Sequence, residues 1–183
     1  MKIIIPKTYV EIDLAYGPIF FLAGPVRGGD DWQKRAVEEI SKHLTNFYVA
    51  IPYYYNNLQN FPLIAKGEHG VEGKFVRQLN WERYYIDLAS KHGCQIIWLP
   101  EESKTNPRDE GNYANDTLGE IARASVELKY NPQNRVVAGA EKGFYSLSQI
   151  QRNFALDQGS TGDLKFPFYE TLELTILAAV KKA

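Results

Sequence analysis

The sequence is poor in cysteine and histidine. It contains one cysteine, Cys94, and three histidines in 183 residues. An intramolecular disulfide is therefore impossible, and cysteines cannot supply a zinc site. His43, His69 and His92 show neither metal-ligand spacing nor the grouping with serine or cysteine that a nucleophilic triad requires. The sequence thus predicts no metal site, and its chemistry is expected to rest on other side chains.

A surplus of basic charge and a long apolar run are also missing. The formal net charge is −1, with 44% hydrophobic and 23% charged residues. This composition is ordinary for a globular domain and offers no basic field for a polymeric nucleic acid, although a single nucleoside can still bind. No segment approaches the roughly 20 apolar residues of a membrane span, and the N-terminus lacks the apolar core of a signal peptide. We therefore expect a cytoplasmic protein without a membrane or a nucleic-acid polymer as partner.

Short apolar runs alternate with helical patterns along the chain. The runs at 19–23 and 48–52 predict buried strands, and the segment between them predicts a helix with Asp30 or Asp31 as N-cap. Strand, helix and strand in this order are typical of a βαβ unit with a parallel sheet. Further elements are expected as helices over 74–91, 117–128 and 168–182 and as strands over 95–99 and 135–139.

These elements predict one α/β domain over residues 1–183. The expected architecture is a Rossmann-like (flavodoxin-like), doubly wound parallel sheet of four to five strands flanked by helices, with residues 1–17 as an N-terminal arm or edge strand. Ligands bind such sheets at the carboxyl ends of the strands. That rule selects the loops 24–31, 52–73 and 100–120. The irregular segment 53–72 is expected to be a functional lid or a partner contact.

The loop after the first apolar run is one candidate site. Gly24 and Pro25 end the strand, and Arg27, Asp31 and Trp32 follow. Glycines after a strand let a ligand approach the backbone closely. A plain turn explains them equally well, because the pattern is neither GxGxxG nor a Walker A loop. Adjacent aspartates at the helix start oppose the binding of a phosphate there.

Two helical carboxylates are the other candidates. Glu82 lies within a helix whose other turns carry apolar residues, and Glu120 follows Asp116 and Thr117 at the start of the next helix. Structural explanations exist for both, because Glu82 can be a solvated carboxylate and Thr117 with Glu120 has the spacing of a capping box. In the functional interpretation, the helix N-terminus keeps Glu120 ionised at neutral pH and aims it at a ligand.

The candidate motifs follow one another in an informative order. Within residues 21–32, a strand ends in Ala-Gly-Pro and the sequence Arg-Gly-Gly follows. Next, Trp81-Glu82 precedes a strand that ends in Trp98-Leu99-Pro100. Thr117-Leu118-Gly119-Glu120 comes last. This order, over residues 18–140, resembles the nucleoside 2-deoxyribosyltransferase family. The resemblance implies a Rossmann-like sheet, cleavage of the N-glycosidic bond of 2′-deoxynucleosides, and a homo-oligomer.

The resemblance also implies roles for individual residues. By position, Glu120 corresponds to the nucleophile and Glu82 to the second carboxylate, which binds the sugar and assists proton transfer. Asp87 is a rival for Glu82, and Asp116 is a third carboxylate that can protonate the leaving base. A covalent glycosyl–Glu120 intermediate is implied, and it needs no metal or organic cofactor. The residues expected to contact substrate are Gly24, Pro25, Arg27, Asp31, Trp32, Tyr53, Asp87 and Gly119.

Three functions stay open on the sequence. The first is deoxyribosyl transfer, with a small-molecule nucleoside and a nucleobase as partners. The second is hydrolysis of nucleosides or nucleoside 5′-monophosphates, for which Arg27 could hold the phosphate. The third is a nucleotide-binding module without catalysis. The presence of both Glu82 and Glu120 speaks against a pure binding module, because binding needs no carboxylate that faces C1′.

Overall fold

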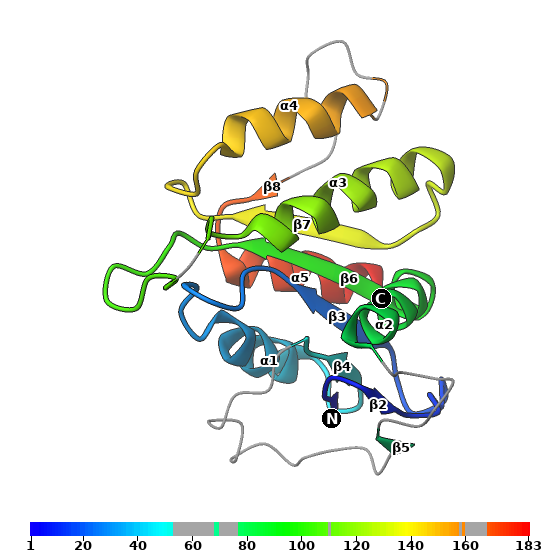
Figure 1. Ribbon diagram of the computed structural model, residues 1–183. Helices are drawn as coiled ribbons and strands as arrows, with labels where there is room; N and C mark the ends of the chain where they lie inside the picture. The colour runs from blue at the N-terminus through cyan, green and yellow to red at the C-terminus, as the bar shows by residue number, and fades with distance from the viewer. Residues whose placement is uncertain (53–67, 70–76, 110, 158, 160–167) are drawn as a thin grey trace.

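The computed structural model describes residues 1–52, 68–69, 77–109, 111–157, 159 and 168–183. A six-stranded sheet runs through the middle of the molecule in the order β1-β4-β3-β6-β7-β8, and all its neighbouring strands are parallel (Figure 1). A separate antiparallel pair joins β2 to β5. The strands are β1 Lys2–Ile4, β2 Thr8–Tyr9, β3 Ile19–Ala23, β4 Tyr48–Ala50, β5 Glu68–His69, β6 Gly93–Leu99, β7 Val136–Ala140 and β8 Phe168–Tyr169. The helices are α1 Trp32–His43, α2 Gln78–His92, α3 Asn115–Tyr130, α4 Leu147–Asp157 and α5 Leu172–Lys182.

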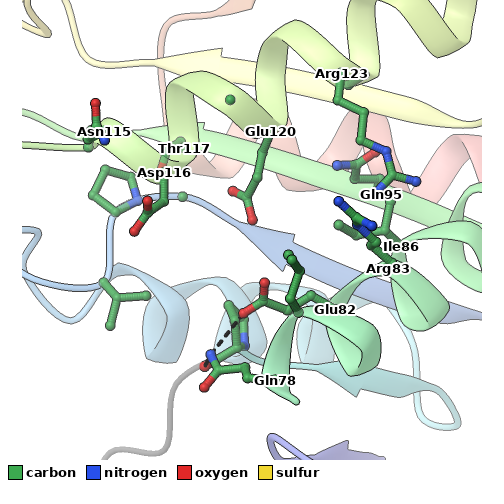
Figure 2. Close-up of a pocket in the computed structure, with 18 of the residues that line it drawn as sticks. Gln78, Glu82, Arg83, Ile86, Gln95, Asn115, Asp116, Thr117, Glu120 and Arg123 are labelled. Atoms are coloured by element: carbon green, nitrogen blue, oxygen red, sulfur yellow. Dashed lines mark hydrogen bonds between the residues drawn. The ribbon is translucent and has the colours of Figure 1, made fainter. Parts of the chain in front are cut away.

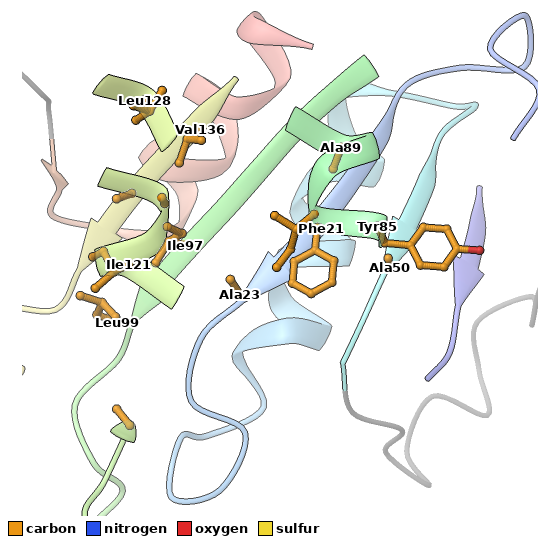
Figure 3. Close-up of a cluster of buried hydrophobic side chains, with 14 of the residues drawn as sticks. Phe21, Ala23, Ala50, Tyr85, Ala89, Ile97, Leu99, Ile121, Leu128 and Val136 are labelled. Carbon is orange, nitrogen blue, oxygen red and sulfur yellow. The ribbon is translucent and has the colours of Figure 1, made fainter. Parts of the chain in front are cut away.

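The sheet separates two apolar layers, as a doubly wound fold requires. Alternate residues of β3 point to opposite faces, so that Phe21 and Ala23 pack with α2 and α3, whereas Phe20 and Leu22 pack with α1 and α5. Figure 3 shows the first of these layers, where side chains of β3, β6 and β7 meet those of α2 and α3. Burial of a large apolar side chain contributes roughly 1.5–3 kcal/mol, so these layers hold the sheet and its helices in place.

The predicted fold class is confirmed, but the strand count is not. The sheet has six strands rather than four to five. The additional strand is β8, whose two residues begin the segment 168–182 that was predicted as one helix. That helix begins instead at Leu172, because Thr171 accepts a hydrogen bond from the Leu174 amide at 3.2 Å and caps it. The helix α4 was not predicted, whereas the edge strand expected within 1–17 is present as β1.

The start of α3 also differs from the prediction. The helix begins at Asn115, and Ala114 occupies the N-cap position with a left-handed φ of 57° and no side-chain cap. The proposed capping box of Thr117 and Glu120 is therefore wrong, and Glu120 lies in the second turn. At α1, Asp31 holds the N-cap position as expected, but its side chain makes no capping hydrogen bond.

Candidate active site

The main cavity lies where the order of the strands reverses. From β3 the chain moves to β4 on one side and then crosses to β6 on the other, so the carboxyl ends of β3 and β6 flank a topological switch point. A cavity of about 760 Å³ opens there, between α2 and α3. The loop after β3 contributes Gly24, Pro25 and Arg27 to its wall. The site therefore occupies the position that the strand-end rule predicts.

Three carboxylates converge on this cavity from two helices. Glu82 comes from α2, and Asp116 and Glu120 come from α3, where their spacing of one helical turn places them on the same face. Figure 2 shows the three side chains directed into the space between the helices. Glu82 accepts a hydrogen bond of 2.8 Å from Gln78. Gln78 also donates to the Pro52 carbonyl at 2.8 Å, which ties the carboxylate to the segment after β4.

The buried side of α2 fixes the direction of Glu82. Trp81 is fully buried, and its ring nitrogen donates to the Thr8 carbonyl at 3.0 Å. One turn later, the Tyr85 hydroxyl accepts a hydrogen bond of 2.9 Å from the Val10 amide. These contacts hold α2 against the segment that carries β2. Because Glu82 directly follows the anchored Trp81, it faces the cavity instead of the core.

The electrostatics of the cluster favour a bound proton. Burial raises the pKa of Glu120 to about 8, with additional increases from the charges of Glu82 and Asp116 and an opposing effect of Arg123. Burial likewise raises the pKa of Glu82, the hydrogen bond from Gln78 lowers it, and the charge of Asp116 raises it. The prediction that the helix N-terminus keeps Glu120 ionised is therefore wrong, because burial and neighbouring charges outweigh it. Glu120 therefore retains a proton near neutral pH, and its titration is coupled to the charge of Glu82.

The loop after β3 is shaped by a buried tryptophan. The Trp32 side chain is fully buried, and its ring nitrogen donates to the Pro25 carbonyl at 2.8 Å. A Cβ atom at Gly24 would lie 2.4 Å from the Trp98 carbonyl oxygen and 2.6 Å from the Trp32 ring, so only glycine fits there. Trp32 thus packs against the loop and holds it in place, and its side chain does not line the cavity.

The remaining predicted site residues are divided between the cavity and other places. Gly119 lines the main cavity, whereas Asp31 lines a neighbouring cavity of about 780 Å³. Asp87 is exposed on α2 and forms an ion pair of 2.8 Å with Lys91, so Glu82 and not Asp87 faces the three-carboxylate site. Tyr53, which was expected to contact substrate, lies outside the described residues.

Several cavity residues escaped the sequence prediction. Gln95 lies in β6 and is 2% exposed, and it is a polar residue in an otherwise apolar strand, a signal that could have been noticed. Arg83 follows Glu82 directly, and Arg123 lies one helical turn after Glu120. Helical spacing could have found Arg123 once Glu120 was placed at a site, whereas Arg83, as the direct neighbour of Glu82, gives no such signal. Gln78, one turn before Glu82, could have been found from its helical spacing.

Comparison with known proteins does not identify a family. No protein-family model matches the chain, and no curated protein matches it either. The likeness to deoxyribosyltransferases therefore rests on the motifs and on their meeting at one cavity. Within the described ranges, no group of three or more His, Cys, Asp or Glu side chains is arranged to hold a metal ion. No helix in the described part of the chain has the length and apolar character to cross a bilayer.

Proposed function

We propose that this chain cleaves the N-glycosidic bond of 2′-deoxynucleosides and transfers the deoxyribosyl group to another nucleobase, with Glu120 as nucleophile. The observation that carries the proposal is the convergence of Glu82, Asp116 and Glu120 on one cavity (Figure 2). Cleavage at C1′ passes through an oxocarbenium-like transition state, which nearby carboxylates stabilise. The cavity of about 760 Å³ is of the size that accepts a small molecule such as a nucleoside.

The reaction proceeds by two displacements at C1′. The Glu120 carboxylate attacks C1′, a carbon–oxygen bond forms, and the electron pair of the breaking carbon–nitrogen bond leaves with the base. A proton passes from Glu82 or Asp116 to the leaving nitrogen. A ring nitrogen of the second base then attacks C1′, the ester bond breaks, and the acceptor's proton returns to the carboxylates. Two inversions give overall retention.

The retained proton supports these roles. A site with one carboxylate must import a proton for the leaving base, whereas this cluster holds one because burial and mutual repulsion raise the pKa values of Glu82 and Glu120. Attack requires that the proton reside on Glu82 or Asp116 while Glu120 is ionised. Neighbouring carboxylates that share a proton can divide the work of acid and nucleophile in this way.

The neighbouring cavity favours a nucleoside over a nucleoside 5′-monophosphate. It shares Arg27 and Arg108 with the main cavity and therefore lies where a 5′-phosphate could extend. Its charged lining consists of Asp30, Asp31, Asp109, Glu141, Arg27, Arg35 and Arg108. Acidic groups outnumber basic ones in this set, which disfavours a doubly charged phosphate.

Product analysis tests the proposal. The purified protein is incubated with deoxyinosine, with and without uracil, and the products are separated by chromatography. We expect deoxyuridine only in the presence of uracil, and we expect its loss in Glu120→Ala. Asp87→Ala is the matched control, because this carboxylate lies on α2 but outside the cavity and should leave the rate unchanged. Free hypoxanthine in equal amount in both tubes would favour hydrolysis, and turnover that survives in Glu120→Ala would refute the assigned nucleophile.

A further inference from the structure

The two ends of the main cavity differ in chemistry. Glu82, Asp116 and Glu120 form one end, and the guanidinium groups of Arg83 and Arg123 lie at the other (Figure 2). Carboxylates accept hydrogen bonds and guanidinium groups only donate them. A ligand that fills the cavity must therefore present an electron-poor centre to the first end and hydrogen-bond acceptors to the second.

Gln95 forms the floor of the guanidinium end. It alternates along β6 with Ile97 and Leu99, whose side chains pack on the α2–α3 face, so its amide points to that face. The residue is 2% exposed, and its Oε1 atom has no hydrogen-bond partner among the described residues. An unpaired buried amide costs about 1–3 kcal/mol. A polar group that stays unpaired at the wall of a cavity is typical of a group that a ligand satisfies.

We propose that Gln95, Arg83 and Arg123 bind the nucleobase and select bases with a lactam edge, a carbonyl beside a ring N–H. Such bases are the 6-oxopurines and the 2,4-dioxopyrimidines, in contrast to the 6-aminopurines. This inference rests on the proposed function and adds the substrate class to it.

The choice between oxo and amino bases depends on the arginines. A glutamine amide can donate to the carbonyl and accept from the N–H of a lactam, but it can also pair with the amino edge of adenine. Arg123 uses its Nε to donate to Glu127, and its terminal nitrogens carry further donors. An exocyclic amino group of the base would place its N–H donors against those of the arginines, and no hydrogen bond would form. A carbonyl oxygen at the same position accepts hydrogen bonds from them.

The same groups assist departure of the base. When the bond to C1′ breaks, its electron pair moves into the base, and in a lactam this charge spreads to the carbonyl oxygen. Arg83 and Arg123 then stabilise the charge where it develops. The carboxylate end of the cavity thus acts on the sugar, and the guanidinium end acts on the departing base.

Replacement of Gln95 by leucine tests the proposal, because leucine removes the amide and keeps the volume. Gln33→Leu is the matched control, since Gln33 is likewise fully buried with an unpartnered amide but lies on α1, on the opposite face of the sheet. Values of kcat/KM are measured for deoxyinosine and deoxyadenosine as donors. In Gln95→Leu we expect a loss of about tenfold to a hundredfold for deoxyinosine and less than about threefold for deoxyadenosine. In Gln33→Leu we expect neither value to change.

A binding measurement separates the two proposals. Calorimetric titration of Glu120→Gln with each nucleoside reports base recognition without turnover. The inference is supported if deoxyinosine binds more tightly than deoxyadenosine and if Gln95→Leu or Arg123→Met abolishes this difference. Arg152→Met, at an exposed position of α4, is the control and should leave the difference unchanged. Equal binding of both nucleosides, or an equal loss for both in Gln95→Leu, overturns it and leaves the proposed function standing. Absence of binding to any nucleoside overturns both.

Discussion

Replacement of Glu82 by glutamine should shift the pH dependence of the proposed reaction to lower pH. The pKa of Glu120 is raised from 4.5 to about 8 by burial first and by the charge of Glu82 second. Because the reaction needs the proton that the carboxylate cluster retains, kcat/KM of the wild type should fall as the pH rises through about 8 and this proton is lost. Glu82→Gln removes the repelling charge and keeps the side-chain volume. The pKa of Glu120 should therefore fall, but it should stay above 4.5, since burial, the largest cause, remains.

The size of the shift follows from the coupling of charges in a shared site. A like charge close to a carboxylate disfavours its ionised form and therefore raises its pKa. Because Glu82 ranks behind burial as a cause, we expect the alkaline limb of the profile to move down by about one pH unit, equivalent to about 1.4 kcal/mol. The ratio of variant to wild-type kcat/KM should then be up to about tenfold higher near pH 6 than near pH 9. A reduced plateau is also expected, because Glu82 is a proton donor in the proposed reaction.

The assay is kcat/KM for deoxyinosine across the pH range from about 5 to 10, so that the position of the limb is read independently of the plateau. Asp116→Asn should move the limb in the same direction by a smaller amount, since its charge ranks behind that of Glu82. Asp87→Asn, on the same helix but exposed, is the control and should leave the limb unmoved. If the limb stays at the same pH in Glu82→Gln, the charge of Glu82 does not affect the pKa of Glu120. If the limb moves to higher pH, the charge of Glu82 lowers this pKa and the predicted direction is wrong.

Two further changes should alter stability. Glu120→Gln should stabilise the protein at alkaline pH: the folded-state pKa of about 8 exceeds 4.5, so the free energy of unfolding falls as the pH rises between these values, and glutamine escapes this loss. Urea unfolding should show a gain of about 1–3 kcal/mol near pH 9 and none near pH 4, and a pH-independent effect would contradict the raised pKa. Gly24→Ala should lower the free energy of unfolding by at least about 2 kcal/mol, because its Cβ would lie 2.4 Å from the Trp98 carbonyl oxygen. An unchanged urea midpoint would show that the loop after β3 moves freely.

The sequence predicted the fold well where apolar patterns are strong. The runs within β3 and β6 are buried on both faces and stand out between helical patterns, and each was placed to within two residues. β8 could not be found, because Phe168 and Tyr169 form a strand only through pairing with Ala138 and Gly139, and two residues carry no periodicity. The edge of the sheet is thus set by tertiary contacts, not by local preference.

The candidate site was predicted in its location more than in its electrostatics. Glu82 and Glu120 were selected from motif order, Asp116 was added as a third carboxylate, and the fold brings all three to one cavity. The pKa of Glu120 could not be read from the chain, because it depends on burial and on Glu82, which is 38 positions away in sequence. Gln95 was counted as part of a buried strand, and its unpaired amide became visible only in three dimensions.

The position of the site explains how three carboxylates can be held together. At the switch point the chain leaves β3 and β6 toward opposite faces, so the crevice is bounded by elements that the sheet fixes separately. Among the hydrogen bonds of the described residues, none joins Glu120 to Glu82 or Asp116. Their repulsion is therefore offset by the apolar layers beneath them, where Ile97 and Ile121 pack with the anchored α2. It follows that core substitutions such as Ile121→Val should lower stability, whereas carboxylate-to-amide substitutions should raise it at alkaline pH. Reactivity in such a site is thus maintained at the expense of folding free energy.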